Sequence, residues 1–299
     1  MGSERKSFVR IFTAGCLWGT IGVFVKLMES RGSSSSYTSF LRLLFGSVIL
    51  ALITLILDGP KAFMIGKNTL ISCILLGTVS RGLFNVCYST SIRMNGMSVA
   101  SVLLYTAPVF TGVMSFILFG ERLDGKKKAA LFINLTGCAL TATGGKLGVV
   151  ALAPVGLLAG IGAGLTYGTT PVFGRIAMKE KSSPLAVAAY NLAFGCIFVA
   201  LFSRPWDTAT VIVSGKLILY GVLFGLVPTA LANGIYFSGL SGITRTSRVP
   251  VVASVELVVA NIIGLLAFRE NFSVVRGIGI VMVLISIALF SGDGAGQEK

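Results

Sequence analysis

The sequence predicts an all-α integral membrane protein, built from ten transmembrane helices that form two inverted five-helix repeats. Three observations predict this fold: the composition, a series of apolar segments and an internal repeat. Of the 299 residues, 54% are hydrophobic and only 12% are charged, and the mean hydropathy is +0.89. A soluble domain carries about 25% charged residues. A chain this apolar could not cover a water-exposed surface, so its natural solvent is a bilayer.

Ten segments are long and apolar enough to cross a bilayer, which takes about 20 residues. In chain order they are 8–28, 36–57, 69–91, 97–119, 128–147, 153–174, 184–203, 216–238, 247–268 and 274–291. The first is the weakest, because only Ile11 to Val25 separates Arg10 from Lys26, and both basic side chains must extend to the headgroups. The segments between the ten are short and leave no room for a soluble domain.

The net charge of +14 indicates an orientation in the membrane rather than a nucleic-acid partner. The basic residues mostly lie in short gaps between apolar segments, as in 122–128, which is typical of cytoplasmic loops. With a cytoplasmic N-terminus, fifteen of the 25 lysines and arginines fall on cytoplasmic segments and eight on the opposite side. We therefore expect a multi-pass protein of the cell (inner) membrane with both termini in the cytoplasm and no bound nucleic acid.

Residue types that carry much of enzyme and metal chemistry are scarce. The sequence contains no histidine, and each of its five cysteines lies inside an apolar segment without a CxxC pair. Histidine-dependent triads and HExxH metal sites are therefore excluded, and the cysteines read as small buried hydrophobic residues. We expect no metal, no cofactor and no enzymatic activity.

The chain repeats itself at an offset near 149. Residues 18–26 read WGTIGVFVK and residues 167–175 read YGTTPVFGR, so both follow aromatic-G-T-x-x-V-F-x-basic. Further matches follow in order: Phe45-Gly46 with Phe194-Gly195, Asn85 and Tyr88 with Asn233 and Tyr236, and 119–121 with 268–270. Each copy carries five segments, and because five is odd the second copy enters the membrane from the opposite side. We predict two domains, 1–148 and 149–299, of the inverted kind that builds transporters with a substrate site where the copies meet.

Several short motifs point to one known family. They are Trp18-Gly19 in the first segment, Arg42 in the second, APVF and GERL at 107–110 and 120–123, and SVELVVA at 254–260 with a later Glu270. In this order and spacing the chain resembles the EamA-type transporters of the drug/metabolite transporter superfamily. The resemblance implies ten helices in two repeats around a central cavity, alternating access and small-metabolite substrates, amino acids among them. One departure is Leu257, where the family often has proline, so a bend there is weaker or comes from Pro250.

Charged residues inside apolar segments are costly and are therefore functional candidates. Three stand out: Arg42, Arg81 and Glu256, the last being the only carboxylate well inside a segment. Arg42 matches an arginine that the family commonly carries, but it could equally bind backbone carbonyls and hold helices together. Glu256 is a candidate proton carrier or partner of a substrate ammonium, with a fixed ion pair to Arg42 or Arg81 as the alternative.

Aromatic and amide side chains form the second group of candidates. Polar groups that face lipid lack partners, whereas in a wet cavity they can recognise a solute. Asn85 and Tyr88 are one helical turn apart, as are Asn233 and Tyr236, so each pair shares a face. Hydrogen bonds between helices are the alternative role. The candidates of this group are Trp18, Asn85, Tyr88, Tyr105, Tyr167, Asn233 and Tyr236.

Glycines and prolines are expected to shape the helices. Gly164 and Gly168 answer to Gly15 and Gly19 in the first copy, and such stripes of small residues let helices approach closely. Gly22 and Pro171 hold equivalent positions and are candidate bending points. The full set of helix-bending and packing candidates is Gly19, Gly22, Pro108, Gly164, Gly168, Pro171 and Pro228.

Together these features predict a secondary active transporter of small polar metabolites that works by alternating access, most simply an amino-acid exporter. A zwitterion needs a cation for its carboxylate and an anion or aromatic face for its ammonium, which an arginine, Glu256 and the tyrosines supply. The alternatives are export of another metabolite or drug-like solute, or a non-transporting channel or scaffold. We expect a proton as the candidate coupling ion, the lipid bilayer as the surroundings, and a monomer or weak homodimer.

Overall fold

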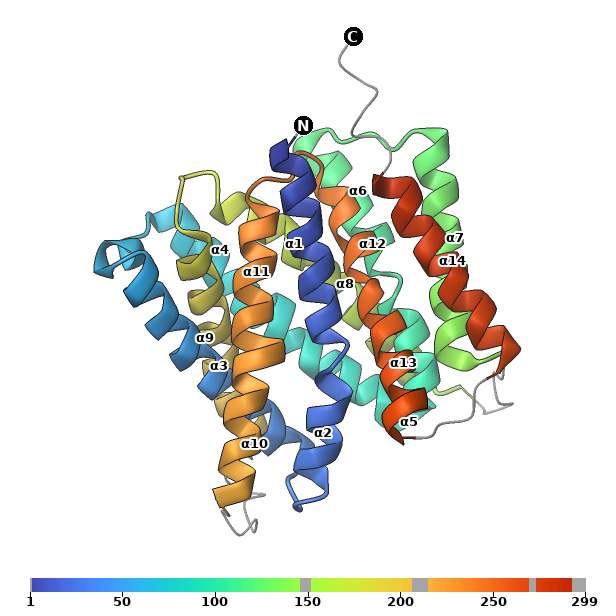
Figure 1. Ribbon diagram of the computed structural model, residues 1–299, viewed down its shortest axis with the longest axis horizontal. Coiled ribbons are helices and arrows are strands. Elements are labelled where there is room, and N and C mark those ends of the chain that lie inside the picture. Colours follow the sequence, from blue (N-terminus) through green and yellow to red (C-terminus); the bar gives the residue numbers. More distant parts are fainter. Residues whose placement is uncertain (1, 146–151, 206–214, 269–272, 292–299) are drawn as a thin grey trace.

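The computed structural model describes residues 2–145, 152–205, 215–268 and 273–291, and every regular element in these ranges is a helix (Figure 1). The first half contains α1 (Gly2–Trp18), α2 (Ile21–Glu29), α3 (Ser35–Leu57), η1 (Pro60–Phe63), α4 (Lys67–Gly77), η2 (Thr78–Leu83), α5 (Phe84–Leu104), α6 (Ala107–Phe119) and α7 (Gly125–Thr143). The second half contains α8 (Pro154–Ala177), α9 (Pro184–Ser203), α10 (Gly215–Gly225), η4 (Leu226–Leu231), α11 (Ala232–Leu240), η5 (Thr246–Arg248), α12 (Val249–Ala253), α13 (Val255–Phe268) and α14 (Val274–Ser291). The expected all-helical fold is confirmed. Glu270 of the sequence motif lies outside the described residues.

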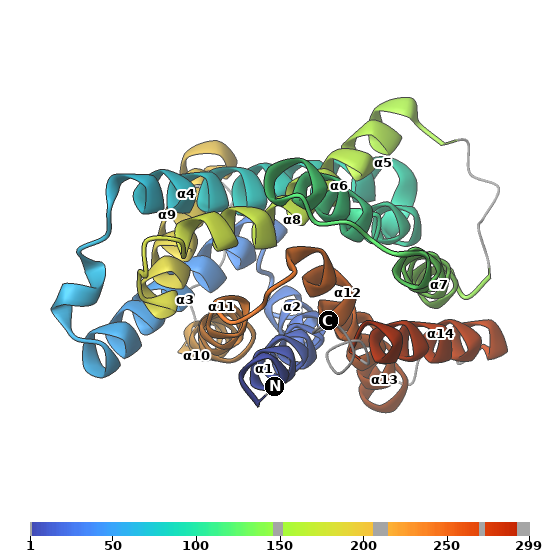
Figure 2. The same ribbon diagram turned by 90° about the horizontal axis from the view of Figure 1, so that it is seen from above.

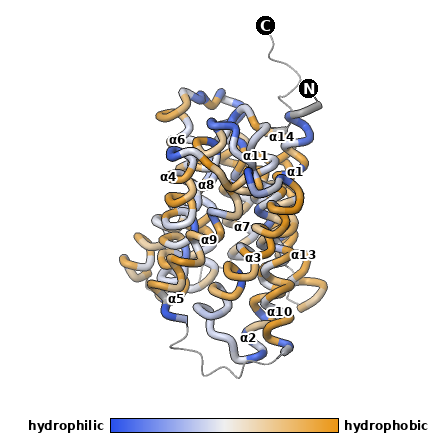
Figure 3. Tube along the Cα trace, turned by 90° about the vertical axis from the view of Figure 1, so that its left-hand side faces the viewer, coloured by the Kyte–Doolittle hydropathy of each residue, from blue (hydrophilic) through white to orange (hydrophobic). Residues whose placement is uncertain are grey.

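The surface of the molecule suits a bilayer. Large apolar side chains are widely exposed along the helices, among them Ile56 (79%), Phe132 (70%) and Leu266 (75%). Figure 3 shows hydrophobic residues along most of the length of the helices and hydrophilic residues mainly toward the two ends. Apolar side chains that would be unfavourable in water are at home against lipid tails.

Six helical stretches are long and apolar enough to cross a membrane. They are Glu4–Glu29, Ser35–Leu57, Lys67–Leu104, Pro184–Phe202, Gly215–Leu240 and Thr246–Phe268. Two further helices, Ala107–Phe119 and Val274–Phe290, are apolar but shorter. Helices α7 and α8 lie among them but contain more lysine, threonine and glycine. Length and composition thus establish a multi-span protein, and the number of ten spans stays a prediction.

The two halves of the chain interleave. Helix α3 packs on α9, α1 on α11, α5 on α8 and α7 on α14, so that each pair takes one helix from each half. Seen from above, α7 and α14 lie side by side at one end of the molecule, and α3, α9 and α4 lie together at the other (Figure 2). The buried core therefore lies mainly between the halves, and neither half has a separate core of its own.

Several long stretches are interrupted part-way along. Residues 19–20 separate α1 from α2, residues 105–106 separate α5 from α6, and Ser254 separates α12 from α13. One long stretch in each half is interrupted by a π-helical segment. η2 lies between α4 and α5, and η4 lies between α10 and α11. The interruptions at 105–106 and at Ser254 are 149 residues apart, and η2 and η4 are 148 apart. Such irregular turns are frequent at functional sites and in the discontinuous helices of transporters.

The glycine stripes mark equivalent close contacts in the two halves. A Cβ added at Gly19 would lie 2.8 Å from the carbonyl oxygen of Glu256, and one added at Gly168 would lie 2.9 Å from that of Ala107. Residues 107 and 256 are 149 apart, as are residues 19 and 168. The same helix-to-backbone contact thus occurs once in each half, and it leaves no room for a methyl group.

Neither Gly22 nor Pro171 coincides with a break in its helix. The chain breaks before Gly22, at residues 19–20, where the Thr20 hydroxyl donates to the Leu17 carbonyl at 2.7 Å. Helix α8 runs unbroken through Pro171. On the turn before the proline, the Thr111 hydroxyl of α6 donates to the Gly168 carbonyl at 2.8 Å and helps to hold the helix in place. Packing here overrides the local preference of proline.

The other three prolines that the sequence singled out stand at interruptions. Pro108 and Pro250 lie in the first turns of α6 and α12, and Pro228 lies within η4. The sequence left two possibilities for the ninth segment, a weaker bend at Leu257 or a bend supplied by Pro250. The helix breaks at Ser254, one turn after Pro250. Asn134 of α7 donates to the Ser254 hydroxyl at 2.9 Å and to the Ser286 hydroxyl at 2.8 Å, and thereby fixes this break between α7 and α14.

Candidate substrate site

Most of the polar residues predicted for the site come together around the interruptions of the helices. Trp18 ends α1, Arg81 lies in η2, Tyr105 lies between α5 and α6, and Glu256 follows the break at Ser254. Tyr167 comes from α8, which contacts both α5 and η2. The chain therefore brings residues from both halves to one place.

Glu256 lies among two tyrosines and an arginine. The Tyr105 and Tyr167 side chains and the Arg81 guanidinium all interact with its carboxylate. The carboxylate and the three groups around it come from four different helical stretches. The site thus holds one anion among two hydroxyls and a cation, an arrangement that can bind an ammonium group or exchange a proton.

Arg81 is held by the second half of the chain. Its Nη2 donates to the Oδ1 of Asn233, whose own Nδ2 donates to the Thr229 carbonyl at 2.7 Å. The Nε of Arg81 is buried without a hydrogen-bond partner. Asn233 is buried at 1% exposure and positions the guanidinium, while its contact with a solute stays a prediction.

Arg42 is the second cation of the site. Its guanidinium carbon lies 5.4 Å from the ring centroid of Phe224, and Arg81 is close enough to repel it electrostatically. Its Nε is buried without a partner, which does not fit the alternative of an arginine held by backbone carbonyls. Two guanidinium groups that repel each other leave positive charge that an anionic group can balance.

Aromatic rings line the same region in two groups. Trp18 and Tyr236 have ring centroids 5.0 Å apart. Phe84 stacks on Tyr88 at 5.6 Å and packs against Tyr167 at 5.4 Å. Phe84 and Phe224 could not be predicted as site residues, because phenylalanine is common in apolar segments and nothing in the sequence distinguishes these two.

Asn85 differs from its counterpart in the second half. It accepts a hydrogen bond at 3.4 Å from Ser89, one turn further along the same helix, whereas Asn233 holds Arg81. The Tyr88 hydroxyl pairs with Ser101 at 3.2 Å. Asn85 and Tyr88 thus both form their hydrogen bonds within α5, whereas Asn233 bonds to the other half of the chain.

Most of the charged, phenolic and amide groups predicted for the site are only half-buried. Of the ten predicted site residues, seven are half-buried, namely Arg42, Arg81, Asn85, Tyr88, Tyr105, Tyr167 and Glu256. Groups of this kind gain no stabilisation from lipid, yet here they gather among helices, face one another and keep part of their surface open. Within the described parts of the chain, no three acidic, cysteine or histidine side chains gather as a metal would require.

Comparisons with known proteins agree with this architecture. A model of the EamA-like transporter family matches residues 6–143 and again residues 154–292. The chain belongs to the EamA-like transporter family. The double match covers both halves, and it makes this protein a multi-pass membrane transporter and not an enzyme.

Its relatives carry the same general description. An uncharacterized transporter of Archaeoglobus fulgidus is 29% identical over 284 residues, which cover 93% of this chain and 94% of that protein. The uncharacterized inner membrane transporter YicL of Salmonella typhimurium is 25% identical over 305 residues, covering 100% and 99%. A solved crystal structure of a protein that is 19% identical superposes with a TM-score of 0.79 over 95% of this chain and 96% of that one. The structural likeness supports the EamA-type membrane fold.

Proposed function

We propose that this EamA-family transporter carries small zwitterionic metabolites, amino acids being the simplest class, and exports them across the inner membrane. The observation that carries the proposal is the pairing of opposite charges in one half-buried cluster. Arg81 and Arg42 can receive a carboxylate, and Glu256 with its tyrosine hydroxyls can receive an ammonium. The rings of Trp18 and Tyr236 are suited to the apolar part of the solute.

Alternating access is the mechanism that the repeat favours. The matched segments 6–143 and 154–292 are proposed to be two inverted five-helix repeats, which together make ten spans with both termini in the cytoplasm. The two pairs of equivalent interruptions, η2 with η4 and residues 105–106 with Ser254, are the proposed hinges of the two halves. Rocking of one half against the other then exposes the cluster to one side of the membrane at a time.

A proton is the proposed coupling ion and Glu256 its carrier. A carboxylate that interacts with two hydroxyl groups and a cation can exchange these partners for the solute or a proton. The transporter is proposed to act as a monomer or weak homodimer, because the cluster is assembled from the two halves of one chain.

The test is a thermal-stability screen of the purified protein, since a ligand that binds only the folded state raises its unfolding temperature. We expect amino acids to raise it, and matched compounds that lack either the carboxylate or the ammonium to have little effect. Glu256→Gln should abolish the preference for the ammonium, and Arg81→Gln the preference for the carboxylate, while Glu180→Gln, a carboxylate of an exposed loop, changes neither. Equal shifts from amino acids and from the singly charged compounds would contradict the proposal.

A further inference from the structure

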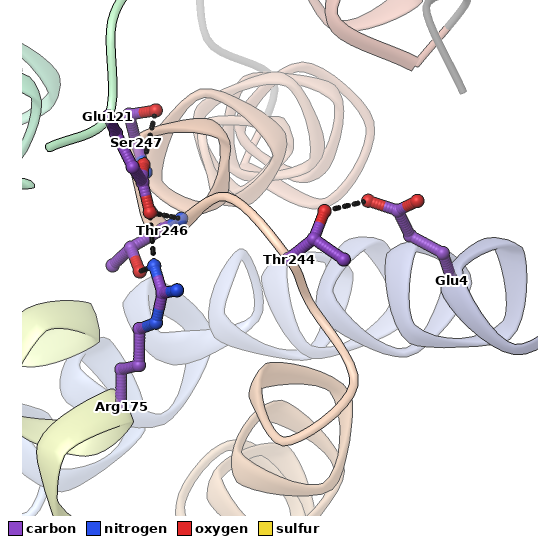
Figure 4. Close-up of polar contacts among 6 residues, drawn as sticks. All are labelled: Glu4, Glu121, Arg175, Thr244, Thr246 and Ser247. Atoms are coloured by element: carbon purple, nitrogen blue, oxygen red, sulfur yellow. Dashed lines mark hydrogen bonds and ion pairs between the residues drawn. The ribbon is translucent and has the colours of Figure 1, made fainter. Parts of the chain in front are cut away.

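A dense polar network closes the end of the molecule at which the N-terminus lies. Its centre is Glu121, which follows α6 and whose side chain is only 7% exposed. The Oε1 atom accepts from the Thr246 backbone amide at 2.8 Å and from Arg175, with which it also forms an ion pair. The Oε2 atom accepts from the Ser247 amide at 3.0 Å and its hydroxyl at 2.9 Å. Figure 4 shows these donors converging on one carboxylate.

The network joins elements from both halves of the chain. Arg175 comes from α8 and also donates to the Thr246 hydroxyl at 2.8 Å, so α6, α8 and η5 are held together. Beside it, Glu4 of α1 accepts a hydrogen bond from Thr244 at 2.7 Å (Figure 4). Its Oε1 also lies 3.6 Å from the Nη1 of Arg248. Hydrogen bonds to charged groups are each worth about 1.5–3 kcal/mol, so this end does not part freely.

The helices tied together here also carry the candidate substrate site deeper in the molecule. Trp18 ends α1, Tyr105 precedes α6, Tyr167 lies on α8, and Glu256 lies on the stretch that η5 begins. A solute that moves between the cluster and this end must pass between those helices. The bonds to Glu121 must break for such a passage to open.

One element of the network has a counterpart at the opposite end. The guanidinium of Arg175 lies 4.4 Å from the centroid of the Phe119 ring, and the ammonium of Lys26 lies 3.7 Å from that of Phe268. Residues 26 and 175 are 149 apart, and so are residues 119 and 268. Helix α2 and the end of α13 lie at the opposite end of the molecule from the loop after α6 (Figure 1). The same cation-over-ring contact therefore occurs once at each end.

We propose that Glu121, Arg175, Thr246 and Ser247 form a latch that closes one end of the transport path, and that Lys26 and Phe268 belong to the equivalent latch at the other end. This inference rests on alternating access as the proposed function. The latch at the Glu121 end opens when the carboxylate releases the amides of η5, and the two latches open in turn.

The test measures whether water reaches a buried reporter beneath the latch. Ser115 is fully buried, lies one turn before Phe119 on α6, and its hydroxyl has no hydrogen-bond partner, so Ser115→Cys should be tolerated. A thiol reacts as its thiolate and therefore needs water. The rate at which a charged, impermeant thiol reagent modifies residue 115 is followed by mass spectrometry of its peptide, which separates it from the native cysteines.

Glu121→Gln keeps the shape of the side chain and removes its charge. We expect labelling of residue 115 to rise about tenfold, the change that corresponds to about 1.4 kcal/mol. Asp124→Asn is the matched control, because Asp124 lies in the same loop but binds only Lys127 of its own helix, at 2.9 Å. The hydrogen bond from the Lys127 amide, and then that from its side chain, lower the pKa of Asp124, so this variant also removes a carboxylate charge. The control should label at the wild-type rate.

Two more variants keep the test decisive. Ser247→Ala removes a single donor, should fold even if Glu121→Gln does not, and should give a smaller rise. Lys26→Met weakens the opposite latch. It should lower labelling of residue 115 below the rate in the Ser115→Cys protein that carries no latch substitution. Unchanged labelling in folded Glu121→Gln and Ser247→Ala proteins, or a rise with Lys26→Met, would overturn the latch. Labelling reports whether the latch is open and not whether a solute is transported. Increased labelling in a protein that does not transport amino acids would therefore overturn only the proposed substrate.

Discussion

Glu256 illustrates how a single residue can be found from sequence and still gain its meaning from structure. A lone carboxylate in an apolar segment is conspicuous because burial of a charge is costly. Its partners are not visible in the sequence, since Tyr105, Tyr167 and Arg81 come from distant positions. Arg81 interacts with the carboxylate but also donates to Asn233, so the choice between a proton carrier and a fixed pair with an arginine stays a prediction.

The role of Glu256 in coupling can be tested by Glu256→Gln, which keeps its shape but cannot titrate. We expect the variant in proteoliposomes to exchange substrate still, but to lose the acceleration that a pH gradient gives the wild type. Glu180→Gln, in an exposed loop, serves as the control and should respond as the wild type does. A well-folded Glu256→Gln protein with the full pH response would show that this residue carries no proton.

Charge within apolar segments identified site residues from the sequence, whereas aromatic character identified only some of them. Arg42, Arg81 and Glu256 stand out because charged side chains are rare in spans. The positioning role of Asn233 and the contribution of Phe84 depend on which residues face each other across the two halves. That information is tertiary, so no spacing within one segment contains it.

At the scale of helices, the interruptions were the hardest feature to predict. The breaks at 105–106 and at Ser254 contain no glycine, and η2 and η4 are π-helical without a shared sequence signal. They are held by contacts such as that of Asn134 with Ser254. Conversely, Pro171 and Gly22 are locally unfavourable for a helix, yet no interruption falls at either residue. Tertiary packing decided these points against local preference.

The glycine stripe gives a sharp prediction at this scale. Gly19→Ala places a methyl group 2.8 Å from the Glu256 carbonyl, and such overpacking costs about 1–3 kcal/mol. Gly22→Ala is the matched control, because nothing lies within 4 Å of a Cβ there. We expect the unfolding temperature to fall with Gly19→Ala and to stay level or rise with Gly22→Ala. Equal effects of the two substitutions would show that the close contact at residue 19 does not constrain the helices.

For the whole molecule, the sequence repeat was the most informative feature. It predicts that equivalent positions make equivalent contacts, and the close approaches at Gly19 and Gly168 and the cation-over-ring contacts of Lys26 and Arg175 follow the same offset. The interleaving of the halves was not predictable, because an internal repeat shows that two units exist but not how they pack.

Orientation in the membrane is a separate prediction for the whole molecule. The distribution of lysine and arginine places the loop that contains Ser182 in the cytoplasm, and the exposed Ser30 on the opposite side. In intact cells an impermeant thiol reagent should label Ser30→Cys but label Ser182→Cys only after permeabilisation. Labelling of Ser182→Cys in intact cells would reverse the proposed topology.

The most direct test of the account is counterflow of a radiolabelled amino acid in proteoliposomes. A transporter that alternates between two sides exchanges labelled solute outside for unlabelled solute inside. We predict transient accumulation of the label, saturation with rising substrate, and loss of both in a folded variant that combines Arg81→Gln with Glu256→Gln. Uptake that rises in proportion to concentration without counterflow would indicate a channel, and counterflow that survives the double substitution would contradict the site described above.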